Sequence, residues 1–163
     1  MKCPAILQPK LQVKTIYDIN FNELKSLGIT NLILDVDDTL LPRRSMDITP
    51  TLFEWVARRK EEGFKLCLAS NSRYPARVQY IGRTLSIPYM FFGLKPLPFA
   101  FWKAMKILNS TPNNTAMIGD QLFMDILGAN LLGIYSIFTE LLTPEVFEPR
   151  KLMRLLEKWL LEK

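Results

Sequence analysis

Short apolar runs alternate with helical patterns along this chain, and this alternation limits its possible folds more than any other feature. The apolar runs, which have the length and composition of buried strands, span residues 32–34, 64–69, 89–92, 115–118 and 134–138. Helical patterns lie at 21–27, 50–62, 75–85, 98–108, 122–131 and about 144–163, while 1–19 look extended. We therefore predict a single α/β domain over 1–163, with a catalytic core at about 30–140. Its sheet should be parallel, doubly wound and Rossmann-like, with helices on both faces to give three layers.

Polar residues of the kinds used in catalysis follow three of the predicted strands. They are Asp35 and Asp37 after the first strand, Ser70 and Asn71 after the second, and Asp120 after the fourth. In a parallel sheet the carboxyl ends of the strands are where ligands bind, so these side chains are expected to converge on one crevice. Asp35 and Asp37 alternate along an extended strand end and should point the same way, about 6.6 Å apart along the chain. Because burying a carboxylate is costly, the cluster requires a cation or hydrogen-bond donors.

The composition excludes several kinds of chemistry. The chain has no histidine, which removes Ser-His-Asp and Cys-His catalysis as well as histidine zinc sites. Its net charge of +5, from 21 basic and 16 acidic side chains, favours an anionic partner such as a phosphate, an acidic lipid or a nucleic acid. The chain carries no aromatic-plus-basic motif of an RNA-binding module, so a nucleic-acid partner is not expected.

The cysteines and the apolar segments bear on where the protein works. Cys3 and Cys67 lie far apart and form neither a disulfide framework nor a CxxC metal site, which suits a reducing compartment. No apolar run approaches the length of about 18 residues that suggests a membrane span. The start of the chain, broken by Pro4 and Pro9, does not read as a signal peptide. We therefore expect a cytoplasmic protein.

Four motifs occur in order along the chain. They are Asp35-Val36-Asp37-Asp38-Thr39, Ser70-Asn71, Lys95-Pro96, and Gly119-Asp120 with Asp125. On these motifs, roughly residues 30–140 resemble the haloacid dehalogenase (HAD) superfamily of phosphotransferases. A finer likeness, to the phosphatidylglycerophosphate phosphatase branch of subfamily IIIA, rests on 11–27 with Tyr17-Asp18-Ile19, on 31–41, and on Gly119-Asp120-Gln121 with Gly128 and Asn130. The resemblance implies a HAD-like fold and a phosphatase, and the finer likeness implies phosphatidylglycerophosphate as its substrate.

An aspartate can act as a nucleophile without histidine because its carboxyl group, with an ordinary pKa of about 3.9, is ionised at neutral pH. Asp35 would attack phosphorus to form an aspartyl phosphate, and Asp37 would act as general acid and then as general base. An oxygen-only site that must offset anionic charge favours Mg²⁺. The resemblance implies that Asp35, the main-chain carbonyl of Asp37, and Asp120 bind this metal. Lys95 would supply a second positive charge.

The other motif residues have supporting roles in this interpretation. Ser70 would bind phosphoryl oxygens with Asn71 beside it, and Asp125 would orient water on the metal or pair with Lys95. Asp38 and Thr39 follow the first strand, where their ordinary role is to cap the turn, and the role of Asp38 stays open. Taken one at a time, each motif also fits a plain turn or a surface lysine. All four in order favour the functional interpretation.

Three alternatives compete with this interpretation. Cys67 and Arg73 have the Cys-x5-Arg spacing of thiol phosphatases, but Cys67 lies inside an apolar run and no glycine follows it before Arg73, so an inert core cysteine is favoured. Phosphoacceptor domains also combine aspartates with Lys-Pro, but there Lys-Pro follows the phosphorylated aspartate, whereas here it precedes Asp120. A HAD scaffold that acts only as an interaction module has low weight, because every expected catalytic residue is present.

The spacing of the motifs leaves no room for a cap domain. Residues 40–64 hold one loop and one helix, and 72–94 hold one helix. An open site admits a bulky phosphate ester, such as a phosphoprotein, a polymer or a lipid headgroup. Arg43, Arg44 and Arg73 are candidates for a rim that attracts an anionic substrate. Arg77 and Arg83 are explained by a solvated helix face.

The C-terminal segment predicts an amphipathic helix. Its apolar residues lie on one predicted face, which comprises Leu152, Leu155, Leu156, Trp159 and Leu160. The basic residues lie mostly on the opposite face and are Arg150, Arg154 and Lys158. Packing of the apolar face on the protein's own sheet is favoured over contact with an anionic membrane surface, which stays a hypothesis. The oligomeric state is left open.

Overall fold

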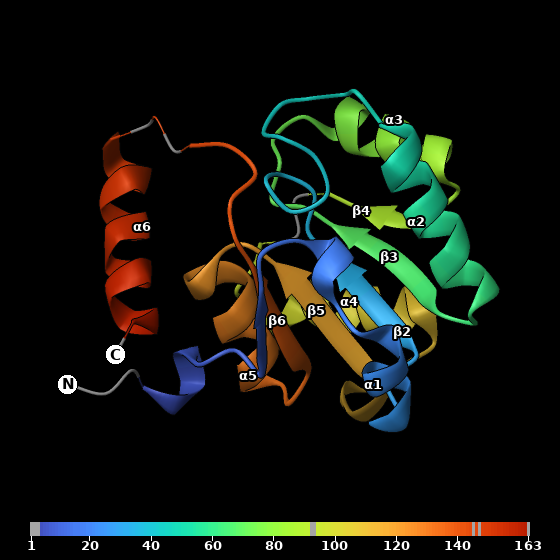
Figure 1. The fold of residues 1–163 in the computed structure, drawn as a ribbon, viewed down its shortest axis with the longest axis horizontal. Coiled ribbons are helices and arrows are strands. Elements are labelled where there is room, and N and C mark those ends of the chain that lie inside the picture. The colour runs from blue at the N-terminus through green and yellow to red at the C-terminus, as the bar shows by residue number, and fades with distance from the viewer. Residues whose placement is uncertain (1–3, 92–93, 145, 147, 163) are drawn as a thin grey trace.

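The computed structural model describes residues 4–91, 94–144, 146 and 148–162. Six parallel strands form one sheet in the order β1-β6-β5-β2-β3-β4 (Figure 1). The strands are β1 (Leu11–Val13), β2 (Asn31–Leu34), β3 (Lys65–Ala69), β4 (Tyr89–Met90), β5 (Thr115–Gly119) and β6 (Tyr135–Thr139). The predicted doubly wound parallel sheet is confirmed. Its direction of winding changes between β2 and β5, the position at which such sheets bind ligands.

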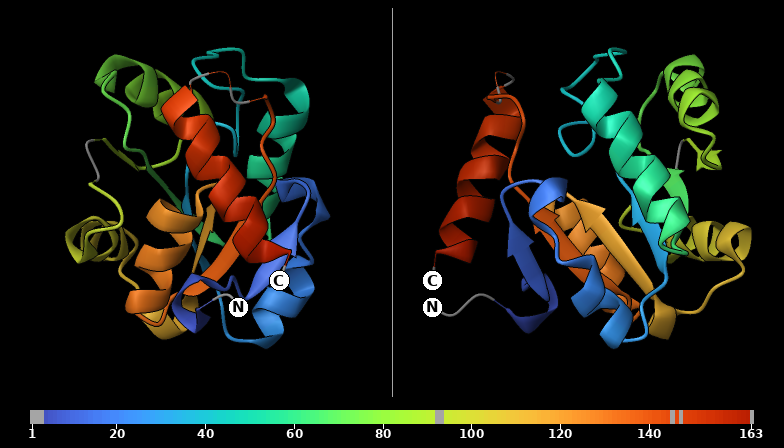
Figure 2. Two further views of the ribbon diagram at one scale, coloured as in Figure 1. Left: turned by 90° about the vertical axis from the view of Figure 1, so that its left-hand side faces the viewer. Right: turned by 45° about the vertical axis from the view of Figure 1, so that its right-hand side comes forward.

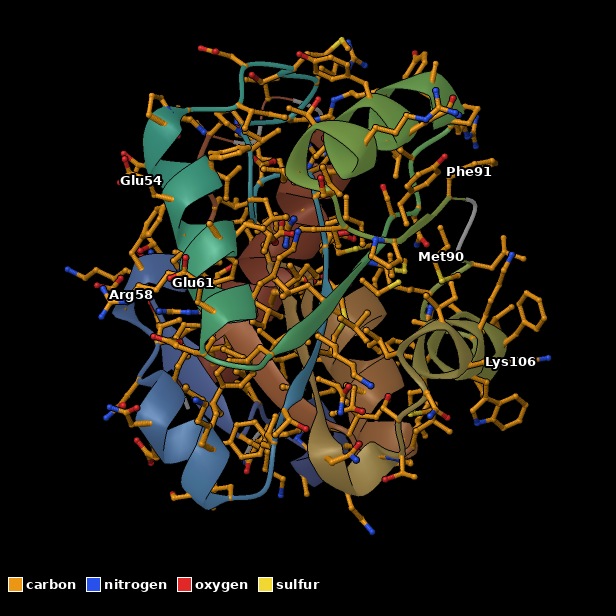
Figure 3. All side chains as sticks on the ribbon, turned by 90° about the vertical axis from the view of Figure 1, so that its right-hand side faces the viewer. Glu54, Arg58, Glu61, Met90, Phe91 and Lys106 are labelled. Carbon is orange, nitrogen blue, oxygen red and sulfur yellow. The ribbon has the colours of Figure 1, made fainter. Side chains whose placement is uncertain are left out.

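Helices cover both faces of the sheet and give the predicted three layers (Figures 1 and 2). The α-helices are α1 (Phe21–Ser26), α2 (Pro50–Glu61), α3 (Pro75–Leu85), α4 (Pro98–Leu108), α5 (Leu127–Leu131) and α6 (Glu148–Leu161). Single-turn elements are η1 (Ala5–Leu7), η2 (Ile16–Asp18), η3 (Pro112–Asn114) and η4 (Leu122–Ile126), the last a π-helical turn that leads into α5. Figure 3 shows Glu54 and Arg58 pointing outward from α2, and Lys106 pointing outward from α4 on the other side of the sheet.

The alternation of side chains along the strands divides the core between the two faces. Leu32 and Leu34 pack with α1, α2 and α3, whereas Ile33 packs with α4 and α5. Local signals set the helix starts, since the Thr49 hydroxyl accepts a hydrogen bond from Leu52 N and Pro50 occupies the first position of α2. Two-sided burial of β2 explains why its sequence is an unbroken apolar run.

Two boundaries differ from the sequence prediction. The N-terminal segment predicted only as extended contains β1, which pairs with β6 and adds a sixth strand at the sheet edge. Its three residues are too few for a strand pattern to stand out. The third predicted strand is shorter than 89–92, because β4 ends at Met90; Phe92 and Gly93 lie outside the described residues.

The expected absence of a cap is seen in the two connections where one would be inserted. All residues between β2 and β4 are described, and they form one loop with α2 and one loop with α3. The carboxyl ends of the strands are therefore not covered by an inserted domain. Among the described residues, no helix combines the length and apolarity needed to cross a membrane.

The C-terminal helix α6 lies beyond the β1 edge, outside the two helical layers (Figure 2). The expectation that its apolar face packs on the sheet is wrong. Its large apolar side chains are exposed, with Leu152 63%, Leu155 62%, Leu156 50% and Trp159 44% accessible. The side of α6 that faces the protein instead carries Arg154 and the buried Glu157, together with Leu160 and Leu161, which pack against the small core cluster around Leu122 and Phe138.

Candidate active site

The carboxyl ends of β2, β3 and β5 bring the sequence motifs together. Asp35 directly follows β2, and its N–H donates to Ile118 O of β5 at 3.0 Å. Ser70 follows β3, and Asp120 follows β5. Asp35, Asp120 and Asp125 are all buried, and one carboxylate oxygen of each lies within 4.8 Å of the others.

Lys95 is the positive centre of this cluster. Its Nζ lies 2.7 Å from Asp35 Oδ1 and 2.6 Å from Asp125 Oδ1, with only 2% of its side chain accessible. The alternative of a surface lysine is therefore wrong. Burial by itself would lower the pKa of Lys95, but the adjacent carboxylates of Asp125 and Asp35 outweigh it and raise the pKa.

Asn71 fixes the backbone at Lys95. Its side-chain amide donates to Lys95 O and its side-chain oxygen accepts from Lys95 N, each at 3.0 Å. This pair of bonds joins the loop after β3 to the Lys95-Pro96 segment. Ser70 Oγ accepts from Ser72 N at 3.0 Å and is buried in the same loop. Asn71 therefore holds Lys95 in position in addition to lining the cleft.

Asp125 approaches the cluster because the residue before Asp120 is glycine. A Cβ atom at Gly119 would lie 2.2 Å from Asp125 Oδ2, which is far inside any allowed contact. Asp125 Oδ2 accepts from Gln121 N at 3.1 Å, while Oδ1 binds Lys95. Of the two roles expected for Asp125, the structure shows the pairing with Lys95.

Asp120 is held from two sides. Thr39 Oγ1 donates to Asp120 Oδ1 at 3.2 Å, so Thr39 supports a member of the cluster rather than only capping a turn. From the other side, Arg154 of α6 lies 2.5 Å from Asp120 Oδ2 and donates to Asp120 O at 2.5 Å. This contact could not be predicted from the sequence, because the helical pattern assigned Arg154 to a solvent face.

Asp37 lies at the rim of the site and not in the buried cluster. Its carboxylate pairs with Arg77 at 2.9 Å and accepts from Arg44 N at 3.2 Å. The interpretation of Arg77 as part of a solvated helix face is wrong: it is 7% exposed, and its Nε donates to Ser45 O at 2.8 Å. Helical spacing alone could not have shown that α3 begins beside the Asp37 loop.

Asp38 has a structural role that the sequence left open. It is buried with φ of 60°, and its carboxylate pairs with Arg43 at 3.0 Å and accepts a hydrogen bond from the Thr143 hydroxyl. These contacts tie the loop after β2 to the segment after β6. Arg43 therefore contributes to this tie as well as to the rim.

Burial changes the proton affinity of the two inner carboxyl groups. It raises the pKa of Asp125 to about 6, with Lys95 opposing and Asp35 adding to the effect. Burial and the charge of Asp35 also raise the pKa of Asp120, against the lowering effect of Arg154. Clustered carboxylates that resist ionisation are a common feature of sites that bind cations or move protons.

The donor set fits a divalent cation. Three carboxylates converge, and Asp35 Oδ2 is buried with no hydrogen-bond partner among the described residues. A cation bound to oxygen ligands alone would satisfy this oxygen and offset the surplus negative charge. The cluster could therefore hold a divalent metal.

A cleft of about 850 Å³ opens above the cluster. Its walls include Asp35, Asp37, Ser70, Asn71 and Lys95. The expected rim residues Arg43, Arg44 and Arg73 also line it. The arrangement offers a buried carboxylate, a fixed cation and surrounding arginines, which together suit the binding of a phosphate ester.

The thiol alternative is not supported by the structure. Cys67 lies inside β3 and is buried, and burial raises the pKa of its thiol to about 12. A thiol with such a pKa is almost fully protonated at neutral pH and is a poor nucleophile.

Comparison with known proteins yields related phosphatases. A family model described as HAD-hydrolase-like matches residues 94–141, which include Lys95, Asp120 and Asp125. The probable phosphatase YqeG of Bacillus subtilis is 34% identical over 125 residues, covering 77% of this chain and 72% of that protein. Phosphatidylglycerophosphate phosphatase 1 of Arabidopsis thaliana is 26% identical over 166 residues, covering 93% of this chain and 48% of that protein, so this chain spans about half its length.

A solved structure supports the fold. The cobalt-bound form of deoxy-D-mannose-octulosonate 8-phosphate phosphatase (YrbI) from Haemophilus influenzae superposes with a TM-score of 0.54. The two chains are 16% identical over 83% of this chain and 92% of that one. At this identity the likeness concerns the fold alone.

Proposed function

Because this chain belongs to the HAD-like hydrolases and is a phosphatase of that family, we propose that it hydrolyses phosphate monoesters through an aspartyl phosphate on Asp35. The observation that carries the proposal is the position of Asp35 in the wall of the cleft, with one oxygen held by Lys95 and the other without a donor among the described residues. The catalytic core then comprises residues 30–140 of a single catalytic domain.

The reaction has two steps. A carboxylate oxygen of Asp35 attacks phosphorus, the bond from phosphorus to the ester oxygen breaks, and Asp37 donates a proton to the leaving alkoxide. Asp37, now a carboxylate, takes a proton from water, which attacks phosphorus and frees both inorganic phosphate and the Asp35 carboxylate. Arg77 keeps Asp37 at the rim, where leaving group and water arrive.

Positive charge must offset the approach of one anion to another. Lys95 supplies a fixed charge, and Asn71 holds its backbone in place. Ser70, which lines the cleft, would bind phosphoryl oxygens. Mg²⁺ bound by Asp35, the Asp37 carbonyl and Asp120 would neutralise phosphoryl charge.

The substrate we propose is phosphatidylglycerophosphate, which would be converted to phosphatidylglycerol. The plant relative named for this activity and the uncapped cleft with its rim arginines support this choice. The runner-up is a phosphate ester of another class, on a protein, nucleotide or sugar. We propose a cytoplasmic location because the spacing of Cys3 and Cys67 in the sequence does not form a disulfide framework.

The exposed apolar face of α6 supports contact with an anionic membrane surface. Leu152, Leu155 and Leu156 project away from the protein, and basic residues are frequent along the same helix. Such a helix lies in the interfacial plane of a bilayer, with its apolar face in contact with the lipid. A lipid headgroup could then reach the uncapped cleft.

A substrate panel with Mg²⁺ tests the activity. It should contain phosphatidylglycerophosphate, nucleotides, sugar phosphates and phosphopeptides, with release of inorganic phosphate as the readout. Asp35→Asn should abolish turnover while leaving the circular dichroism spectrum unchanged, and Asp47→Asn, at an exposed aspartate of the following loop, serves as the matched control. An active Asp35→Asn protein would contradict the mechanism, and turnover of sugar phosphates alone would contradict the lipid substrate.

Sedimentation with vesicles tests the membrane contact separately. Binding to anionic vesicles at low salt, weakened by Leu155→Glu, is expected because this side chain is exposed and the substitution leaves the core intact. Equal recovery in the supernatant with and without vesicles would contradict the contact.

A further inference from the structure

We infer that α6 acts as a built-in competitor for the metal site, because Arg154 places its positive charge on Asp120. Docking of α6 and binding of a divalent cation would then oppose each other. The inference rests on the proposed function only in taking Asp120 as a metal ligand.

The contact is specific. Arg154 Nη2 lies 2.5 Å from Asp120 Oδ2, and Nη1 donates both to Asp120 O at 2.5 Å and to Glu157 Oε2 at 2.9 Å. The Arg154 side chain is 14% accessible and that of Asp120 is not accessible at all. A surface helix therefore sends a guanidinium into the buried carboxylate cluster.

The charges in the cluster explain why this matters. Three carboxylates lie together, and Lys95 compensates two of them by direct contact. Arg154 contacts the third, so each carboxylate already has a cationic partner. Counting Glu157, which also pairs with Arg154, a bound divalent cation would bring four positive charges to four negative ones. The cation and the Arg154 guanidinium would nevertheless share one carboxylate, that of Asp120, and like charges at this range repel strongly where water is scarce. Removal of the Arg154 side chain relieves that repulsion.

α6 is attached in a way that permits release. Its apolar residues point outward, so few of them hold it down. The docked side depends on polar bonds, since Glu157 accepts from Leu122 N at 3.0 Å and from Phe123 N at 3.4 Å. A cavity of about 520 Å³ beside these contacts is lined by residues of both α6 and the sheet edge, among them Phe138 and Leu161. Lys95, by contrast, lies on a segment tied to the core through Asn71.

Thermodynamic linkage makes the effect reciprocal. If docked α6 weakens metal binding, then metal binding weakens α6 docking by the same factor. Metal binding at the carboxylate cluster would thus release α6, and conditions that displace α6 would favour metal binding.

Isothermal titration of the metal-stripped protein with Mg²⁺ tests this. Arg154→Gln should bind Mg²⁺ on the order of tenfold more tightly than the wild-type protein, within the usual range of coupling between sites. Lys158→Gln removes the same charge from the same helix, at a side chain that is 73% accessible, and should leave the affinity unchanged. Hydrogen exchange of the α6 amides should accelerate when Mg²⁺ is added to the wild-type protein, and Asp120→Asn should remove that response.

Two outcomes would overturn the inference in distinguishable ways. Unchanged or weaker Mg²⁺ binding by Arg154→Gln, with clear binding by the wild-type protein, would make Arg154 a positioning residue for Asp120 and leave the proposed function standing. Failure of both proteins to bind Mg²⁺ would refute the proposed metal site, and this inference with it.

Discussion

Replacement of Lys95 by methionine should strongly destabilise the metal-free protein at pH 8. The Lys95 ammonium contacts Asp35 and Asp125 in a fully buried setting, and the substitution leaves both carboxylates without that partner. Removing one member of a buried ion pair typically costs about 3–5 kcal/mol. Because two carboxylates lose their partner, we expect a loss near the upper end, about 4–5 kcal/mol, of a total stability that is generally about 5–15 kcal/mol.

The loss should shrink as the pH falls. The pKa of Asp125 is already raised to about 6, and removal of the Lys95 charge, which lowers it, would raise it further. A carboxyl group whose pKa is higher in the folded than in the unfolded state contributes most stability below its unfolded pKa, and loses this contribution as the pH rises through the folded pKa. At pH 5 Asp125 is protonated in the variant, so its burial no longer costs a charge. Adding Asp125→Asn to Lys95→Met should recover about 2 kcal/mol at pH 8.

Urea unfolding followed by circular dichroism at pH 8 and pH 5 measures these quantities. Lys103→Met, the same change at an exposed position of α4, is the control and should cost less than about 0.5 kcal/mol. A loss below about 1 kcal/mol at pH 8 would refute the view of Lys95 as the charge partner of the cluster. An equal loss at both pH values, or no recovery by Asp125→Asn, would refute its electrostatic origin.

Further predictions concern single residues. Gly119→Ala should cost about 1–3 kcal/mol in thermal or urea unfolding and weaken metal binding, because the new methyl group overlaps Asp125; unchanged stability would contradict the contact. Asn71→Ala should lower kcat more than it raises KM and should lower the free energy of unfolding by about 1–3 kcal/mol, because the polar groups of the Lys95 backbone lose their partners. Restored activity in Asn71→Asp, whose side chain cannot donate to Lys95 O, would argue that the two hydrogen bonds are not both needed. Cys67 should resist thiol reagents in the native protein while a chelator stops turnover; inactivation by the reagent before unfolding would revive the thiol mechanism.

The sheet could be predicted because the sequence patterns that identify its strands are local. An unbroken apolar run such as Leu32–Leu34 followed by aspartate identifies both a buried strand and its carboxyl end, and parallel topology then brings distant strand ends together. The edge strand β1 was missed because a strand of three residues, two of them half-buried and one exposed, carries almost no pattern.

The contacts of the arginines could not be predicted for a different reason. Arg77 and Arg154 both lie on amphipathic helices, where the ordinary expectation for an arginine is a solvent face. Each is instead directed inward by a carboxylate, Asp37 or Asp120, that belongs to a remote part of the chain. Helical periodicity describes only one element, so it cannot report a charge contributed by another. For α6 it predicted Leu152 and Leu155 on the packed side and Arg154 on the solvent side, whereas the structure exposes the two leucines and directs Arg154 inward.

The bond between Thr143 and Asp38 limits how α6 can move. Among the described residues, Thr143 is the last before α6 that bonds to the loop after β2. A rotation of α6 about its first residue, Glu148, would therefore have its pivot beyond this bond. Arg154 comes six residues after Glu148, the first residue of α6, which is about 9 Å along the helix axis. A rotation of only about 20° would carry Arg154 through about 3 Å, enough to take its guanidinium out of hydrogen-bond range of Asp120. Since the pivot lies outside the Asp38 tie, such a swing would leave the catalytic loop at rest.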